Sequence, residues 1–173
     1  MLCTSFIREC TAMHRTDLAA SRSSLYGGAA LRHGRWSVVG AAYLITSTTF
    51  QRDERFAEFW CARAVVRAMR EVHDAGIVHS HAFVVMPDHV HWLFTLSHGR
   101  LCDAVRRFKS ISAKAVNNRT HQGRSVWQRG YHDRCLRRGQ HLRAAARYVV
   151  ANPLRAGLVT RLNDYPHWDA EYL

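Results

Sequence analysis

Two histidines at alternating positions are the first candidates for chemistry in this sequence. His89 and His91 follow the dipeptide Pro87-Asp88 at the start of an apolar, β-branched run. In a strand, residues i and i+2 project from one face, so both imidazoles project together while Val90 points to the opposite face. Two adjacent imidazoles form half of a divalent metal site. The alternative is a pair of ordinary strand histidines, although two polar side chains in so apolar a sheet cost free energy unless they have a partner.

A tyrosine and an asparagine later in the chain are candidates to complete such a site. Tyr148 and Asn152 are four residues apart, which places them on one face of a helix. A tyrosine hydroxyl becomes an effective nucleophile beside a metal or another cation, and its attack on a DNA phosphate would leave a covalent phosphotyrosine. Each residue also has a structural interpretation. Tyr148 would pack the helix against a sheet, and Asn152 would cap the turn that Pro153 begins.

Positive charge is concentrated in one part of the chain. The 173 residues carry a formal net charge of +12, and residues 100–155 hold 14 Lys/Arg against two acids, so this segment carries the whole excess. Such a balance predicts a polyanionic partner, most often nucleic acid, although a basic surface kept for solubility is the alternative. The candidates for DNA contacts are Arg106, Arg107, Lys109 and Lys114 on a predicted basic helix, Arg143 and Arg147 beside Tyr148, and Arg32 and Arg35 in the N-terminal segment.

Two aromatic residues in the same basic segment are candidates to stack on unpaired bases. They are Trp127 and Tyr131, and core packing is the alternative for the tryptophan. The five cysteines are odd in number and form no C-x-x-C pair, which argues against a disulfide scaffold or a zinc ribbon and agrees with a reducing cytoplasm. No apolar run reaches the length of a membrane span, so no membrane partner is expected.

The residue pattern predicts the order strand, helix, strand, strand, helix, strand, helix. The chain length indicates one domain, residues 31–173, after a flexible basic leader of residues 1–30. Asp53 is the predicted cap of the first helix, and Gly76 ends it. The fold class expected from this order is α+β: a ferredoxin-like split βαβ antiparallel sheet with helices on one face, plus a C-terminal helix that carries Tyr148. The expected elements are strands 42–50, 78–86, 89–96 and 131–136, and helices 54–75, 101–117 and 140–151.

Three stretches together resemble one known family. They are Met86-Pro87-Asp88-His89-Val90-His91-Trp92, Trp127-Gln128-Arg129-Gly130-Tyr131-His132-Asp133 and Tyr148-Val149-Val150-Ala151-Asn152-Pro153-Leu154-Arg155-Ala156-Gly157-Leu158-Val159, with Leu31-Arg32-His33-Gly34-Arg35-Trp36-Ser37 before them. In order and spacing the set is similar to the REP-associated tyrosine transposases, a branch of the single-tyrosine HUH transposases, and the resemblance covers residues 31–168.

The resemblance implies specific roles for the residues named above. His89 and His91 match the HUH metal pair, Tyr148 matches the nucleophile, and Asn152 stands where many relatives place a glutamine that completes the metal site. The implied cofactor is Mg²⁺ or Mn²⁺. The implied reaction cleaves single-stranded or hairpin DNA, leaving a 5′-phosphotyrosine and a free 3′-hydroxyl, in the cytoplasm of a bacterium and at its nucleoid. Monomer and homodimer both stay open.

Two other functions are consistent with the same residues. One is a catalytically silent protein, derived from such a transposase, that holds hairpin DNA and no longer cuts it. The other is a zinc hydrolase built on the same histidine pair, although no His-x-x-Glu-His set accompanies that pair and the basic half of the chain would then lack a purpose. The identity of the third metal ligand and the DNA sequence that is recognised stay open.

Overall fold

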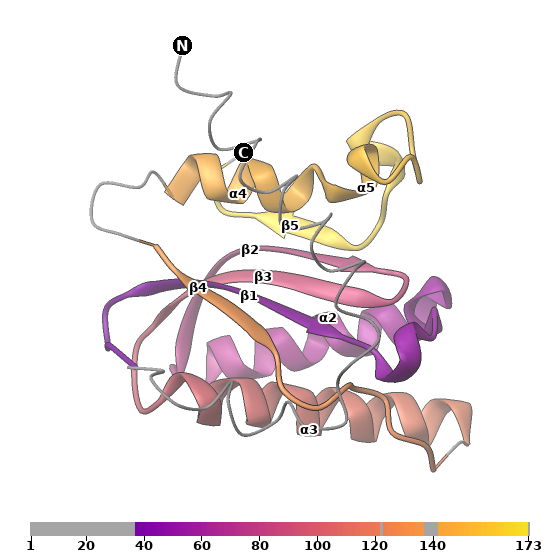
Figure 1. Ribbon diagram of the computed structural model, residues 1–173, viewed down its shortest axis with the longest axis horizontal. Coiled ribbons are helices and arrows are strands. Elements are labelled where there is room, and N and C mark those ends of the chain that lie inside the picture. The colour runs from indigo at the N-terminus through magenta and orange to yellow at the C-terminus, as the bar shows by residue number, and fades with distance from the viewer. Residues whose placement is uncertain (1–36, 122, 137–141, 173) are drawn as a thin grey trace, which may run out of the picture. The chain divides into compact units, whose positions relative to one another are not determined.

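A five-stranded antiparallel sheet organises the part of the chain that this computed structural model describes, residues 37–121, 123–136 and 142–172 (Figure 1). Its strand order is β4-β1-β3-β2-β5. Because β3 lies between β1 and β2, which a helix connects, the arrangement is the predicted split βαβ fold. The strands are β1 (Ala42–Thr48), β2 (Val78–Met86), β3 (His89–Leu96), β4 (His132–Cys135) and β5 (Trp168–Ala170).

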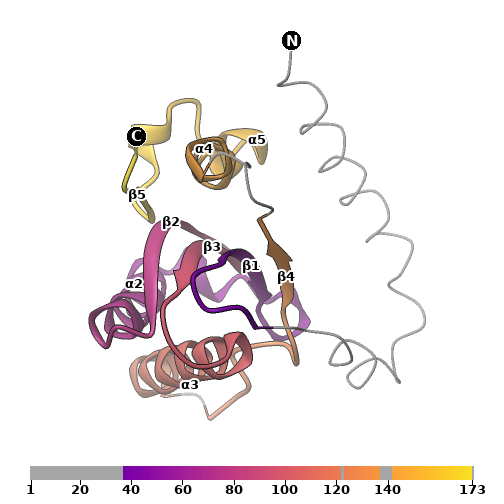
Figure 2. The ribbon, with the colours of Figure 1, turned by 90° about the vertical axis from the view of Figure 1, so that its left-hand side faces the viewer.

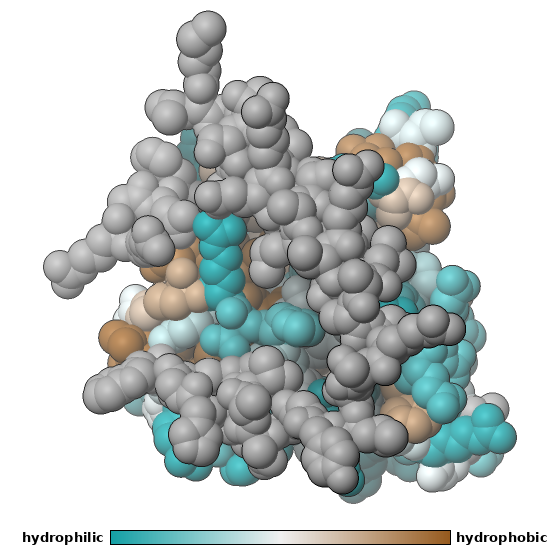
Figure 3. Space-filling model, viewed as in Figure 1, coloured by the Kyte–Doolittle hydropathy of each residue, from teal (hydrophilic) through white to brown (hydrophobic). Residues whose placement is uncertain are grey.

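Helices cover both faces of this sheet. Figures 1 and 2 show α2 (Phe59–Asp74) and α3 (Leu101–Thr120) against one face, and α4 (Leu142–Val150) and α5 (Asn152–Arg155) against the other. The predicted pair of helices on one face and the additional C-terminal helix are therefore confirmed. Apolar side chains gather at the outer surface over α5 in Figure 3, and this segment leaves Leu154 38% exposed. No helix within the described ranges is long and apolar enough to cross a membrane.

Each face of the sheet has its own core, and β3 contributes to both by alternation. Val90, Trp92 and Phe94 are fully buried in the core under α2 and α3. Leu93 is fully buried in the smaller core under α4. Since side chains alternate along a strand, His89 and His91 project to the α4 face of the sheet.

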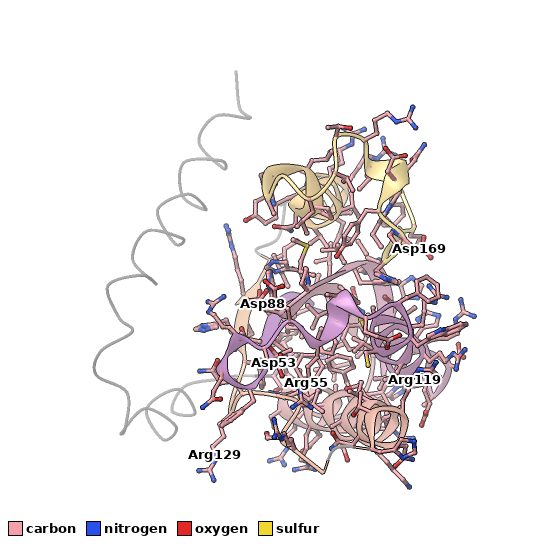
Figure 4. The ribbon with its side chains drawn as sticks, turned by 90° about the vertical axis from the view of Figure 1, so that its right-hand side faces the viewer. Asp53, Arg55, Asp88, Arg119, Arg129 and Asp169 are labelled. Carbon is pink, nitrogen blue, oxygen red and sulfur yellow. The ribbon has the colours of Figure 1, made fainter. Side chains whose placement is uncertain are left out.

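The start of α2 differs from the prediction. Asp53 does not cap the helix; it accepts a hydrogen bond of 2.8 Å from Nε of Arg55, its neighbour in Figure 4. Glu58 is the cap, because its carboxylate accepts from the backbone amides of Trp60 and Cys61. Two short 3-10 turns separate β1 from α2, and within the first of them Gln51 has a φ of 56°, a left-handed conformation that an α-helix does not admit.

The β2–β3 hairpin and the end of α2 agree with the sequence prediction, whereas β5 does not appear in it. The β2–β3 hairpin has the predicted bounds, and Gly76, at a φ of 68°, follows the end of α2 as expected. β5 was not predicted, because three residues are too few to show an alternating pattern. It pairs with β2, placing Trp168 opposite Val84.

Candidate active site

The two histidines of β3 are held with their Nε2 atoms facing each other. These two nitrogens lie 3.1 Å apart, and the rings are nearly perpendicular, at 87°. Nδ1 of His91 lies 2.9 Å from the hydroxyl of Thr46, its cross-strand neighbour on β1. Nδ1 of His89 lies 2.5 Å from a carboxylate oxygen of Asp88. Both Nδ1 atoms are thus occupied by neighbours, and both Nε2 atoms are directed to one place.

Asp88 is held beside His89 in its ionised form. Its other oxygen accepts a hydrogen bond of 3.1 Å from Nη1 of Arg52, and Figure 4 shows Asp88 at the end of the sheet near the 3-10 turns. Partial burial raises the pKa of Asp88, but the hydrogen bonds and charges of His89 and Arg52 outweigh burial and hold that pKa below its usual value. An ionised Asp88 keeps the proton of His89 on Nδ1, which leaves Nε2 free to bind a metal.

The histidine pair fits a single divalent ion. An ion about 2.1 Å from each nitrogen, a usual metal–ligand length, would subtend roughly 95° between nitrogens 3.1 Å apart. The ~90° of octahedral coordination and the ~109° of a tetrahedral site both lie within about 0.3 Å of this nitrogen separation, so the pair can hold either kind of ion. The outward neighbours on β2 are Met86 and Val84, opposite His89 and His91, so the pair is bordered by apolar side chains on that side.

Tyr148 lies on the helix that covers the same face of the sheet. Its half-buried side chain packs against the core under α4, and α5, which follows, contacts β2. The guanidinium carbon of Arg155 lies 4.0 Å from the centre of the Tyr148 ring, and Nη2 of Arg155 donates to the Tyr148 carbonyl at 2.9 Å. Arg155 is not among the residues that the sequence pattern singled out. The sequence does hold a signal for it: Arg155 follows Tyr148 by seven residues, or about two helical turns, which places both residues on one side of a helix.

Asn152 caps the end of α4 in this structure. Its Nδ2 donates to the carbonyl oxygen of Val149 at 2.7 Å and to that of Tyr148 at 3.3 Å, while its Oδ1 accepts from Arg155 at 2.9 Å. The amide is therefore engaged on both sides. Its oxygen could reach a metal ion only if the bond from Arg155 were broken or shared. The third-ligand role of Asn152 stays a prediction.

The basic helix does not share a face with the histidines. Arg106, Arg107 and Lys114 are exposed on α3, which covers the opposite side of the sheet (Figure 2). Arg106 pairs with Asp103 at 2.9 Å. Nζ of Lys109 donates two hydrogen bonds of 2.7 Å to the carbonyls of Gln128 and Gly130, which fasten the segment before β4. These α3 residues are therefore not brought to the candidate site.

Other basic residues do lie on the same side of the sheet as the histidines. On β4, His132 pairs with Thr46 and Arg134 pairs with Leu44, and cross-strand partners share a face. Arg143 and Arg147 are exposed on α4. The two β4 residues were missed as candidates, although the predicted strand contained them, because its register was not known. Arg32 and Arg35, with the leader of residues 1–30 and the predicted helix start at residue 140, fall outside the described residues.

The two aromatic candidates for base stacking differ in their surroundings. Trp127 is 6% exposed, packs against the rings of Phe56 and Phe108, and donates from Nε1 to the hydroxyl of Ser112 at 3.0 Å. The suggestion that Trp127 stacks on bases is therefore wrong, and the tryptophan belongs to the core. Tyr131 is partly buried against the same core.

Comparison with known proteins adds to this geometry. A family model described as "Transposase IS200 like" matches residues 37–152. A REP-associated tyrosine transposase of Escherichia coli (strain K12) is 29% identical over 87 residues, which are 49% of this chain and 50% of the relative, so the chain spans about half the length of this curated protein. A solved structure of a REP-associated tyrosine transposase bound to a REP hairpin superposes with a TM-score of 0.65 at 21% identity, covering 79% of this chain and 81% of that one, and it shares the fold.

Proposed function

The chain belongs to the family of IS200-like transposases, and from that premise we propose that it cuts and rejoins single-stranded DNA at hairpins through Tyr148. One observation carries the proposal. The Nε2 atoms of His89 and His91 converge at 3.1 Å while Thr46 and Asp88 hold the other nitrogen of each ring. A structural histidine pair would not need both rings fixed with their Nε2 atoms facing each other.

The proposed reaction is a transesterification at a DNA phosphate. The hydroxyl oxygen of Tyr148 forms a bond to phosphorus, the bond from phosphorus to the 3′ oxygen breaks, and that oxygen takes up a proton as it leaves. The phenolic proton passes to solvent or to a base. Arg155, whose guanidinium lies 4.0 Å from the ring centre, supplies positive charge beside the developing phosphate ester and holds the end of α4 in place. Attack by a second 3′-hydroxyl on the phosphotyrosine reverses the step and completes strand transfer.

His89 and His91 would hold a divalent ion, which when bound offsets negative charge on the non-bridging phosphate oxygens. Imidazole nitrogens favour Mn²⁺ over Mg²⁺ in such a site, because Mg²⁺ prefers oxygen ligands. The absence of a His-x-x-Glu-His set beside this pair argues against the zinc hydrolase. Asn152 remains the candidate for the third ligand if its bond from Arg155 yields on DNA binding.

DNA would lie along the face that carries the histidines. Its phosphates would meet Arg134 on β4 and Arg143 and Arg147 on α4, with His132 beside them. The structural relative that is bound to a REP hairpin supports a hairpin substrate. The charge on α3 would contribute only to a second, more distant part of the DNA.

The proposal is tested by incubating a labelled hairpin oligonucleotide with Mn²⁺ and protein, followed by a denaturing gel. We expect a covalent protein–DNA adduct from the wild type and from Tyr172→Phe, a matched change at an exposed tyrosine, and none from Tyr148→Phe. Hairpin binding by Tyr148→Phe should stay close to the wild-type level. If the wild type binds the hairpin and forms no adduct, the protein is the catalytically silent binder instead.

A further inference from the structure

A second group of metal-ligating side chains lies near the start of β2. Nε2 of His79 is 3.3 and 3.2 Å from the two carboxylate oxygens of Glu171, and Nδ1 of His81 is 2.9 Å from the nearer of them. The ligand atoms of all three residues lie within 4.8 Å of one another, and within the described ranges this is the one such group of three His, Cys, Asp or Glu side chains. None of the three has a part in the reaction proposed above.

A bulge in β2 brings the two histidines together. The pairing of β2 with β3 shifts between Ser80 and Ala82, so His81 is the extra residue. Nε2 of His81 lies 2.8 Å from the hydroxyl of Thr95, which leaves Nδ1 directed to Glu171. Here again one nitrogen of an imidazole is held by a neighbour while the other faces a possible ion, the arrangement that orients metal-binding histidines. Only 6% of His81 is exposed.

The carboxylate comes from the end of the chain, directly after β5. The backbone amide of Glu171 donates to the carbonyl of His81 at 2.9 Å, so the main chain as well as the side chain fixes Glu171 here. A cavity of about 320 Å³ borders His81 and Glu171 and leaves room for a water molecule as a further ligand. Two imidazoles and one carboxylate, with an open fourth position, are a usual ligand set for zinc.

This group is separate from the histidines of the candidate active site. His79 pairs with Thr95, which lies four residues along β3 from His91, or about 13 Å at the rise of an extended strand. In Figure 4, Asp169 of β5 and Asp88, the residue before His89, lie apart. One ion could not bind to both groups.

We propose that His79, His81 and Glu171 form a second divalent-metal site, of the kind that binds Zn²⁺, which fastens the C-terminal strand to β2. The nitrogen–oxygen distances of 2.9 to 3.3 Å are within a few tenths of an ångström of those between ligands that share one ion. β5 contacts α4, and Trp168 packs into the core beneath that helix. A bound ion would therefore hold the strand that supports the helix of Tyr148, and it would do so without taking part in cleavage.

The test uses the full chain with His89→Ala and His91→Ala, which removes the other pair. Zinc binding is measured by competition with a chromophoric chelator, and thermal unfolding is followed with and without zinc. We expect one equivalent of zinc and a zinc-dependent rise in Tm. Adding Glu171→Gln should weaken binding at least about 100-fold, since even changes that only touch a ligand cost about 10- to 100-fold, and should abolish the rise in Tm. Glu54→Gln, a matched change at an exposed glutamate, should alter neither.

His79→Ala provides a second variant at a side chain that is 48% exposed and that can be removed without opening the core. It should weaken zinc binding as Glu171→Gln does. Equal zinc affinity in the background, in Glu171→Gln and in His79→Ala would overturn the proposal, as would the absence of a bound equivalent in the background. Replacement of zinc by Co²⁺ gives an independent readout, and a strong thiolate charge-transfer band would place the ion at cysteines and refute the site. Because no step measures DNA cleavage, failure here leaves the proposed function untouched.

Discussion

The hydroxyl of Thr46 is predicted to control the metal affinity of a histidine that it touches from the neighbouring strand. Thr46→Val removes the oxygen that lies 2.9 Å from Nδ1 of His91 and keeps a β-branched side chain of similar size, which suits a strand. His91 can then turn about its side-chain bonds, so Nε2 is no longer fixed 3.1 Å from Nε2 of His89. Loss of such an orienting contact weakens metal binding by about 10- to 100-fold, or about 1.4 to 2.7 kcal/mol.

Mn²⁺ binding can be measured directly from the electron paramagnetic resonance signal of the free ion. Thr46→Val should raise the dissociation constant by the factor above. The rate of adduct formation should then recover at high Mn²⁺ concentration, because Tyr148 and the DNA contacts are unchanged. Thr48→Val is the matched control. Thr48 lies on β1 like Thr46 and pairs with His89 of β3, but its hydroxyl is not one of the contacts that hold the imidazoles. Equal affinities for the Thr46→Val variant and the wild type, or an equal loss in Thr48→Val, would refute the reasoning.

Four other changes follow from the geometry. Arg155→Ala should slow adduct formation by about 10- to 100-fold, the equivalent of one hydrogen bond to a charged group, in a single-turnover assay; an unchanged rate would remove Arg155 from the site. Arg134→Ala should weaken hairpin binding and reduce its salt dependence more than Lys114→Ala does, as filter binding over a salt series would show, and the reverse order would place the DNA on α3. Trp127→Ala should lower the free energy of unfolding by about 3 to 5 kcal/mol in urea denaturation, because Trp127 is a core residue; a small loss of stability with a large loss of DNA binding would restore its stacking role. Burial lowers the pKa of Lys109 to about 8, so the folded protein releases this proton at a lower pH than the unfolded chain. The free energy of unfolding, relative to that of Lys109→Met, should therefore rise from pH 7 to about 9.5, where tyrosines begin to ionise. A difference that does not change with pH would mean that Lys109 keeps an ordinary pKa.

Local patterns predicted the parts of the fold that depend on neighbouring residues. The β2–β3 hairpin has the expected bounds because a short turn joins two alternating runs, and that same alternation set His89 and His91 on one face. The predicted start of α2 was wrong, because the left-handed conformation of Gln51 turns the chain soon after β1 and delays the helix. No residue type at that position signals such a conformation, and Asp53 resembles a cap in sequence as closely as Glu58 does.

The layer to which each helix belongs could not be read from the sequence. An apolar stripe identifies the buried side of a helix, but it does not tell which face of the sheet receives it. The basic residues of α3 were therefore grouped with Arg143 and Arg147 as candidates for DNA contacts, whereas the fold places α3 on the opposite side of the sheet from α4. Arg134 and His132 were overlooked for a related reason, since only the register of β4 against β1 turns them to the histidine face.

The contacts of Asn152 show a different limit. Its spacing from Tyr148 was predicted correctly as one helical turn, and both possible roles, a cap and a ligand, were compatible with that spacing. The structure favours the cap, because the amide bonds two carbonyls of α4 and Arg155. A sequence pattern gives the position of a side chain along an element, and the direction of an amide within a network of neighbours lies beyond it.

The most direct test of the central claim is to locate the amino acid that carries DNA in the covalent adduct. Wild-type protein is incubated with a hairpin oligonucleotide and Mn²⁺, the adduct is digested with protease and nuclease, and the nucleotide-bearing peptide is sequenced by mass spectrometry. We predict that the nucleotide is attached through its 5′-phosphate to Tyr148. Attachment to any other residue, or through a 3′-phosphate, would contradict the assignment of the nucleophile and of the bond that is broken.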